Sequence, residues 1–268
     1  MPLRLNHFVG MLIGRYLYLS NSQSKHVVRK NIQLCFAHLN KAEQEELIKK
    51  ALIENTKGVT ESGYIWMRSF EDNAKKVLTI NGIQHLESER PVILLVPHFG
   101  CWEITGRIVA LHKSITFMYK KLRYEKQNEL LLSLRQQQKL YMASADKKGV
   151  LKLQRALKNK QLIAILPDQY PGAEGGIAAS FFGNNAITTT LLPKLARKNN
   201  AKVVLAWAQR LEQGKGYVLN FKPVDILSES GELQADVEKM NKIIEALAKS
   251  KPEQYLWNYK RFKGVIDY

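Results

Sequence analysis

Short apolar segments alternate with stretches of helical periodicity over most of the chain. The apolar segments predict six strands, at residues 77–81, 92–96, 115–119, 162–167, 202–209 and 217–222. Helical spacing predicts helices at 102–111, 124–140, 148–158, 189–198 and about 233–248. Such alternation is typical of an α/β fold with a largely parallel sheet flanked by helices. Gly214-Lys215-Gly216 indicates a hairpin between the last two strands, so the predicted sheet is mixed.

Helical periodicity also dominates the part of the chain before the first predicted strand. Near the start, apolar side chains recur at helical spacing, at Leu5, Phe8, Val9, Leu12, Tyr16 and Leu19. Asn40 followed by Glu43 has the spacing of a capping box, which predicts a helix start. We therefore expect a single domain over residues 1–268, with an N-terminal helical layer (1–75) that covers an α/β core (76–268).

The chain is strongly basic. Its 41 Lys and Arg residues against 24 Asp and Glu give a formal net charge of +17. Such a charge favours an anionic partner, which can be nucleic acid, an anionic membrane surface or an acidic protein. We recognise no nucleic-acid-binding module in the sequence and expect no nucleic-acid partner.

The first 42 residues contain no Asp or Glu. Their uninterrupted apolar portion is far short of the roughly 20 residues of a membrane-spanning helix. Two interpretations of this basic amphipathic helix are compatible with its pattern. It can lie in an anionic membrane interface, pack its apolar face on the rest of the domain, or do both.

The segment 92–103 carries the most distinctive chemistry. A buried parallel strand is predicted at 92–96, Pro97 ends it, and His98 and Glu103 follow near the start of a helix. Open α/β sheets bind ligands at this end of their strands. A neutral His98 can accept a proton from a hydroxyl group, and a Glu103 carboxylate that accepts the other ring N–H would orient it. Alternatively, His98 is incidental and Glu103 is favoured by the helix dipole.

A second strand end repeats this arrangement. Pro167 and Asp168 follow the apolar run 162–166 as Pro97 and His98 follow 92–96, so the two ends can converge on one site. Cys101, near His98, is either a nucleophile or a small apolar filler. The two cysteines, Cys35 and Cys101, lie far apart and form no disulfide framework or metal-ligand spacing, which indicates a reducing compartment.

An ordered set of motifs resembles the bacterial lipid A late acyltransferases, the lauroyl/myristoyl transferase family of the glycerolipid acyltransferase superfamily. The set covers nearly the whole chain. It consists of Asn31-Ile32-Gln33-Leu34-Cys35-Phe36, His98 to Glu103, Pro167-Asp168-Gln169, Phe181-Phe182-Gly183, Thr188-Thr189-Thr190, Pro252-Glu253-Gln254-Tyr255-Leu256-Trp257 and Lys260-Arg261-Phe262-Lys263.

The resemblance implies a glycerol-3-phosphate acyltransferase-like fold and a specific reaction. His98 and Glu103 would be catalytic, and Arg135, Asp168 and Lys120 would bind substrate. The acyl donor would be an acyl-acyl carrier protein, and the acceptor a hydroxyl group of a lipid A precursor. The resemblance implies no cofactor and no metal, and a place at the cytoplasmic face of the bacterial inner membrane.

The chain departs from the family pattern at two positions, and two other functions remain open. Lys120 stands where the family usually has Arg, and Tyr170 where an acidic residue is frequent. One alternative is a Cys101-dependent thioesterase or other hydrolase. The other is a non-catalytic basic protein that binds nucleic acid. The sequence favours the acyltransferase.

Overall fold

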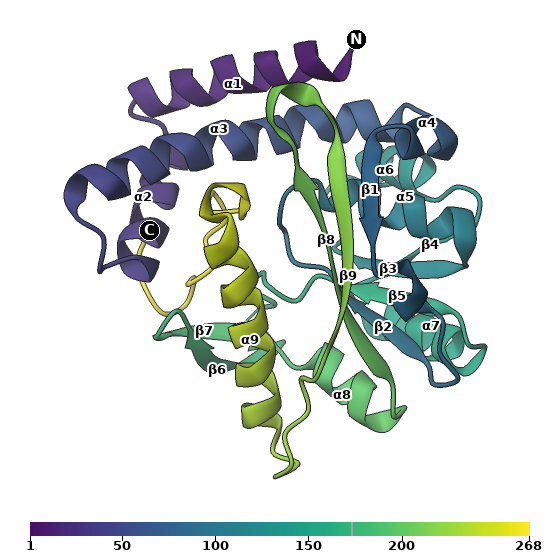
Figure 1. Cartoon of the computed structure of the whole chain (residues 1–268). Helices are drawn as coiled ribbons and strands as arrows, with labels where there is room; N and C mark the ends of the chain where they lie inside the picture. Colours follow the sequence, from purple (N-terminus) through teal and green to yellow (C-terminus); the bar gives the residue numbers. More distant parts are fainter. Residues whose placement is uncertain (173) are drawn as a thin grey trace.

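The computed structural model describes residues 1–172 and 174–268, and its centre is a mixed β-sheet (Figure 1). The strand order is β1-β9-β8-β2-β5-β3-β4. Every neighbouring pair is parallel except β8 and β9, which form the predicted hairpin. The bounds are β1 (Val77–Asn81), β2 (Val92–Leu95), β3 (Ile115–Tyr119), β4 (Leu140–Ser144), β5 (Leu162–Ile165), β8 (Lys202–Arg210) and β9 (Tyr217–Val224). The predicted α/β fold with a mixed, largely parallel sheet is confirmed.

Three strands escaped prediction. The pair β6 (Gly176–Phe181) and β7 (Asn184–Thr189) forms a separate antiparallel sheet. Its turn residues Phe182 and Gly183 both have positive φ, as two-residue hairpin turns require. The predicted helix 124–140 ends early, as α6 (Glu125–Arg135), and β4 follows it. The Gln-rich stretch after Arg135 has helical propensity, but pairing with β3 decides the conformation of this edge strand.

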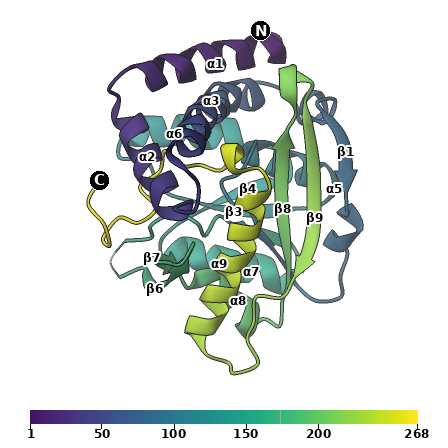
Figure 2. The same cartoon turned by 60° about the vertical axis from the view of Figure 1, so that its left-hand side comes forward.

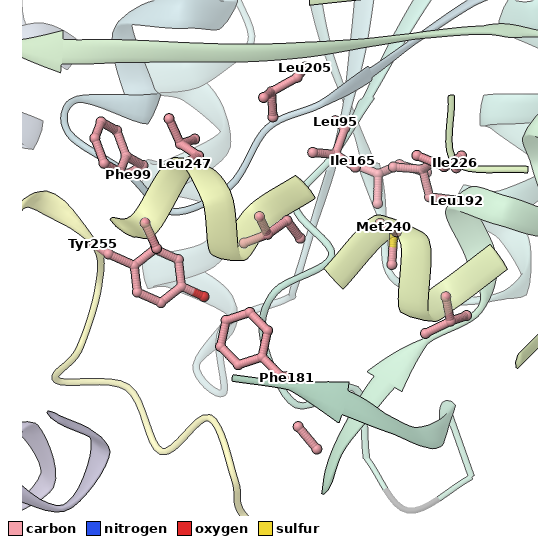
Figure 3. Packing of buried hydrophobic residues seen from close by; sticks show 14 of the residues in the cluster. Leu95, Phe99, Ile165, Phe181, Leu192, Leu205, Ile226, Met240, Leu247 and Tyr255 are labelled. Atoms are coloured by element: carbon pink, nitrogen blue, oxygen red, sulfur yellow. The ribbon is translucent and has the colours of Figure 1, made fainter. Parts of the chain in front are cut away.

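Helices cover both faces of the central sheet. Successive side chains of β2 point to opposite faces of the sheet. Leu94 packs in the cluster that contains α5 (Trp102–His112). Leu95 packs in the cluster on the other face, with α7 (Lys147–Lys158), α8 (Leu191–Lys198) and α9 (Leu233–Ser250). Figure 3 shows Leu95, Ile165 and Leu205 from three neighbouring strands beside Met240 and Leu247 of α9. Burial on both faces explains why these strands are continuously apolar.

Four helices precede the first strand: α1 (Leu3–Leu19), α2 (Gln23–Cys35), α3 (Lys41–Trp66) and α4 (Phe70–Ala74). The predicted capping box at Asn40 and Glu43 begins α3. Figures 1 and 2 both show α1 lying along α3. The two helices approach closely at Gly10 and Gly14, where an added Cβ would lie 2.8 Å from Lys57 Cα and 2.5 Å from Ile53 Cα.

The orientation of α1 decides between the two interpretations of its apolar positions. Its buried face consists of Leu3, Asn6, His7, Gly10 and Gly14. The predicted apolar stripe points away from the protein, with Tyr16 69% and Leu19 81% exposed. The expectation that this stripe packs on the domain is therefore wrong, because two glycines, two polar residues and Leu3 make that contact instead. Across the described residues, no helix combines the length and apolar character that a membrane crossing needs.

Three short 3₁₀ segments complete the description: η1 (Ile83–Leu86), η2 (Glu212–Gly214) and η3 (Pro252–Gln254). The last of these and the residues after it return to the carboxyl end of the sheet. There, Phe99 and Tyr255 form an isolated antiparallel bridge. The C-terminal motif thus packs against the loop that carries His98.

Candidate active site

The two Pro-containing strand ends meet at one edge of the sheet. Strands β2 and β5 are parallel neighbours, with Leu95 opposite Ile165. This register brings His98 beside Asp168, as the repeated pattern predicted. Asp168 Oδ1 lies 2.8 Å from His98 Nδ1, and Asp168 Oδ2 accepts the His98 backbone N–H at 2.8 Å.

Asp168 is suited to orient the imidazole. Its side chain is 1% exposed and that of His98 is 13% exposed. Burial by itself would raise the pKa of Asp168, but the charge and hydrogen bonds of His98 outweigh it and lower this pKa. An ionised Asp168 accepts from Nδ1–H and leaves Nε2 of the neutral ring as a proton acceptor. Gln169 Nε2 lies 3.1 Å from His98 Nε2 and can donate to it.

The loop from His98 to Cys101 is held on both sides. The backbone N–H groups of Gly100 and Cys101 donate to Gln254 O at 3.0 Å and Ala208 O at 2.9 Å. Gly100 has a φ of +56°, and an added Cβ would lie 2.0 Å from Ala208 O. A glycine is therefore required here, and the fixed loop places His98 at the sheet edge.

A buried ionic cluster supports the same loop. Arg210, 4% exposed, donates from Nη2 to the carbonyl oxygen of Gly100 at 2.9 Å. Its guanidinium also binds the carboxylates of Glu61 and Glu54. His7 of α1 lies 3.0 Å from Glu61, which also accepts from the Tyr217 hydroxyl at 2.9 Å. This cluster connects α1, α3, β8 and β9 to the loop that carries His98.

Glu103 does not have the expected role toward His98. Its carboxylate accepts hydrogen bonds from the Arg135 guanidinium and from Trp66 Nε1, the latter at 2.8 Å. Arg135 also stacks over the Trp66 ring, 4.9 Å from its centroid. The physical reason is that Glu103 lies in the first turn of α5 and faces α3 and α6, while Asp168 already occupies Nδ1 of His98. The predicted orienting carboxylate is thus corrected from Glu103 to Asp168.

A cavity of about 580 Å³ opens beside this group, within the range of small-molecule sites. His98, Glu103, Arg135 and Lys120 line it, so four of the five predicted site residues share one cavity. Asp168 does not line it, which corrects its predicted contact with substrate. Further along, the lining is mostly apolar and includes Gly106, Phe117, Leu140, Met142 and Val150.

Cys101 is poorly placed for catalysis. It is 1% exposed, packs in the cluster around α5 and is absent from the cavity lining. Burial, followed by the Glu61 charge, raises its pKa well above the ordinary value, so the thiol stays protonated. Because the thiolate is the nucleophilic form, this environment disfavours a Cys101-dependent hydrolase.

Sequence reasoning missed several residues of the site. Trp66 is the last residue of α3 and lies 37 positions before Glu103 in the sequence. Its neighbours in the sequence indicate only one face of a helix, so nothing local pointed to its contact with Glu103. Thr190 and Lys194 line the cavity from the first turn of α8. Thr190 lies in the motif Thr188-Thr189-Thr190, to which the family resemblance assigns no role. Gln169 follows Asp168 in the motif Pro167-Asp168-Gln169, and the β2–β5 pairing brings it into contact with His98.

Comparison with known proteins agrees with the motifs. Residues 1–264 match the family described as bacterial lipid A biosynthesis acyltransferase. The chain is 27% identical over 263 residues to the lipid A biosynthesis palmitoleoyltransferase of Escherichia coli (strain K12), covering 96% of this chain and 84% of that protein. It is 25% identical over 272 residues to the lipid A biosynthesis lauroyltransferase of the same strain, covering 98% and 87%.

The chain is also similar to solved structures, one of them over most of its length. That structure is the 1-acyl-sn-glycerophosphate acyltransferase PlsC from Thermotoga maritima, with a TM-score of 0.43 and 11% identity. The match covers 92% of this chain and 98% of that one.

Proposed function

The chain belongs to the bacterial lipid A biosynthesis acyltransferase family, and on this premise we propose that His98 is the general base of its acyl transfer. The acyl donor is the thioester of an acyl carrier protein, and the acceptor is a hydroxyl group of a lipid A precursor. One observation carries this proposal: the His98–Asp168 pair lies beside a cavity with an extended apolar lining. This lining suits a fatty acyl chain, and His98 Nε2 suits a hydroxyl proton.

The reaction balances with these residues alone. The acceptor hydroxyl oxygen attacks the thioester carbonyl carbon while its proton moves to His98 Nε2. Asp168 stabilises the resulting imidazolium through Nδ1. The tetrahedral intermediate then expels the carrier's sulfur, which takes the proton back from Nε2. The products are an ester on the acceptor and a free thiol on the carrier.

Arg135 is the candidate for stabilising the negative oxygen of the intermediate. Glu103 and Trp66 fix its guanidinium at the cavity wall. Its Nη1 makes no hydrogen bond within residues 1–172 and 174–268 and can donate to substrate. A donor held in place before the reaction is effective in a water-poor site. In this proposal Glu103 acts through Arg135.

Acyl transfer is tested directly with purified protein, an acyl carrier protein thioester and a lipid A precursor that carries a free hydroxyacyl group. Mass spectrometry should show the acceptor heavier by one acyl group, and the His98→Ala protein is the matched control. Hydrolysis of the thioester with an unchanged acceptor mass would contradict the proposal and support a thioesterase. We expect the carrier thioester to exceed the coenzyme A thioester in kcat/KM at low salt, because the net charge of +17 attracts an acidic carrier.

We also propose that α1 binds an anionic membrane surface, which would place the enzyme at the cytoplasmic face of the inner membrane. Exposed Leu12, Tyr16 and Leu19 form an apolar face without a partner in the described part of the chain. Arg4 and Arg15 are exposed on the same helix, which lacks acidic residues. An exposed apolar stripe with flanking basic charge is the pattern of an interfacial helix.

Vesicle sedimentation tests this surface. Replacing Leu12 and Leu19 together by Glu should release the protein from vesicles that contain anionic lipid. Leu78→Glu on β1 is the matched control, since Leu78 is 59% exposed but lies outside α1. Equal binding by the double variant and the control would contradict the role of α1.

A further inference from the structure

The charges around the cavity are not balanced. Within the described residues, its acidic and basic lining side chains are His98, Glu103, Lys120, Arg135, Asp146 and Lys194. Glu103 pairs with Arg135, and Asp146 pairs with Lys121 and caps α7. Lys120 and Lys194 have no ion pair or hydrogen bond from their ammonium groups in the part of the chain that the structure describes. The cavity therefore carries two uncompensated positive charges, which favour an anionic ligand.

One of these charges, that of Lys194, lies on helix α8 beside a second polar residue of the cavity wall. Lys194 is one helical turn after Thr190, so both side chains lie on the same face of α8. Thr190 is 8% exposed and lines the cavity, and its hydroxyl has no hydrogen-bond partner in residues 1–172 and 174–268. The Thr190 hydroxyl can therefore donate a hydrogen bond to a ligand in the cavity that Thr190 lines. At the start of α8 the Leu191 N–H donates to Thr189 Oγ1 and Pro193 has no N–H, so the helix N-terminus adds only the Leu192 N–H at the same place.

We propose that Thr190 and Lys194 bind a phosphate group of a substrate, with Lys120 adding charge in the same cavity. This inference rests on the proposed function. Both substrates bring phosphate: the phosphopantetheine arm of the donor has a phosphodiester, and the lipid A precursor carries phosphate on its sugars. A phosphate oxygen can accept from the Thr190 hydroxyl and the Lys194 ammonium, and hydrogen bonds to charged groups are the strong ones.

Steady-state kinetics of Lys194→Met and Thr190→Val test the site. Lys198→Met is the matched control, because Lys198 is exposed on the same helix and does not line the cavity. We expect Lys194→Met to raise the KM for one substrate by about 10-fold to 100-fold with a similar kcat. Thr190→Val should raise the same KM by a smaller factor.

Substrates without phosphate identify the source. A KM effect that disappears with an acyl-pantetheine thioester assigns the site to the donor. An effect that disappears with a dephosphorylated acceptor assigns it to the acceptor. Unchanged KM values for both substrates in Lys194→Met, as in Lys198→Met, would overturn the proposal.

A measurement without turnover separates this inference from the proposed function. Inorganic phosphate should protect Lys194, but not Lys198, from acetylation by acetic anhydride, as read by mass spectrometry. Protection in a protein that transfers no acyl group would support the anion site while the acyl-transfer reaction fails. Equal acetylation of both lysines with and without phosphate would contradict the site.

Discussion

Two buried carboxylates are connected to the same loop in different ways. Asp168 binds His98 directly, and His98 is partly exposed, titratable and open to the cavity. Glu61 reaches the loop through Arg210, whose guanidinium is permanently charged, buried and bound to the carbonyl oxygen of Gly100. The first pair can exchange a proton with a substrate, and the second cannot. In the proposed reaction, Asp168 assists the chemistry because its partner can titrate and faces the cavity, whereas Glu61 supports the loop through a partner that cannot.

The largest expected effect follows from removing the titratable partner. His98→Ala should lower the acyl-transfer rate by about 10²–10⁴, the usual contribution of a general base. Its free energy of unfolding should change little beside this, because His98 is a partly exposed loop residue. Rate measurements and denaturant unfolding on the same preparation check both expectations. Wild-type turnover by the folded variant would contradict the catalytic role.

Removing Arg210 from its buried pair with Glu61 should instead lower the stability and leave turnover largely unchanged. Arg210→Met removes the guanidinium that Glu61 and Glu54 share and leaves only His7 beside Glu61 and Lys57 beside Glu54. Loss of one partner of a buried pair costs about 3–5 kcal/mol of unfolding free energy. The folded fraction should keep most of its turnover, measured per folded molecule. Glu61→Gln added to Arg210→Met should recover part of the stability, since it removes one unpaired charge. A large loss of kcat at unchanged stability would instead give Arg210 a role in the reaction and contradict its structural role.

The buried Arg210–Glu61 pair should also contribute stability that is lost at acidic pH. Burial by itself would raise the pKa of Glu61, but Arg210 outweighs it and lowers this pKa from 4.5 to about 2. Because the folded pKa is depressed, the unfolded chain binds the proton first as the pH falls. The stabilisation, roughly 3 kcal/mol, is complete above about pH 4.5 and is lost toward about pH 2.

Denaturant unfolding of wild-type protein and Glu61→Gln at several pH values measures this contribution. The stability difference between the two proteins should narrow as the pH falls from about 5 to about 3. A difference that stays constant over this range would contradict the depressed pKa.

The smallest expected effect concerns the buried thiol of Cys101, whose pKa the Glu61 charge helps to raise. Cys101→Ala should keep acyl transfer close to wild type, because the raised pKa and burial of Cys101 exclude it from the chemistry. Some stability should be lost through removal of a packed sulfur. Steady-state rates and iodoacetamide sensitivity provide the measurements. An inactive but folded Cys101→Ala would restore the hydrolase alternative.

Local patterns predicted the central strands and where their ends meet. The apolar runs before Pro97 and Pro167 belong to strands buried on both faces, and such strands are strongly patterned. The partner of His98 was mispredicted, because proximity in sequence favoured Glu103, whereas the β2–β5 register supplies Asp168. The Arg210 cluster joins residues up to 156 positions apart, and no local pattern encodes such a distance.

The choice of Asp168 over Glu103 is tested most directly by the tautomer of neutral His98. Nitrogen-15 NMR distinguishes a proton on Nδ1 from one on Nε2, with His98→Ala used to assign the signal. The structure predicts Nδ1–H in wild type, the same tautomer in Glu103→Gln, and its loss or mixing in Asp168→Asn. An Nε2–H tautomer in wild type, or a tautomer that changes in Glu103→Gln and not in Asp168→Asn, would contradict the account.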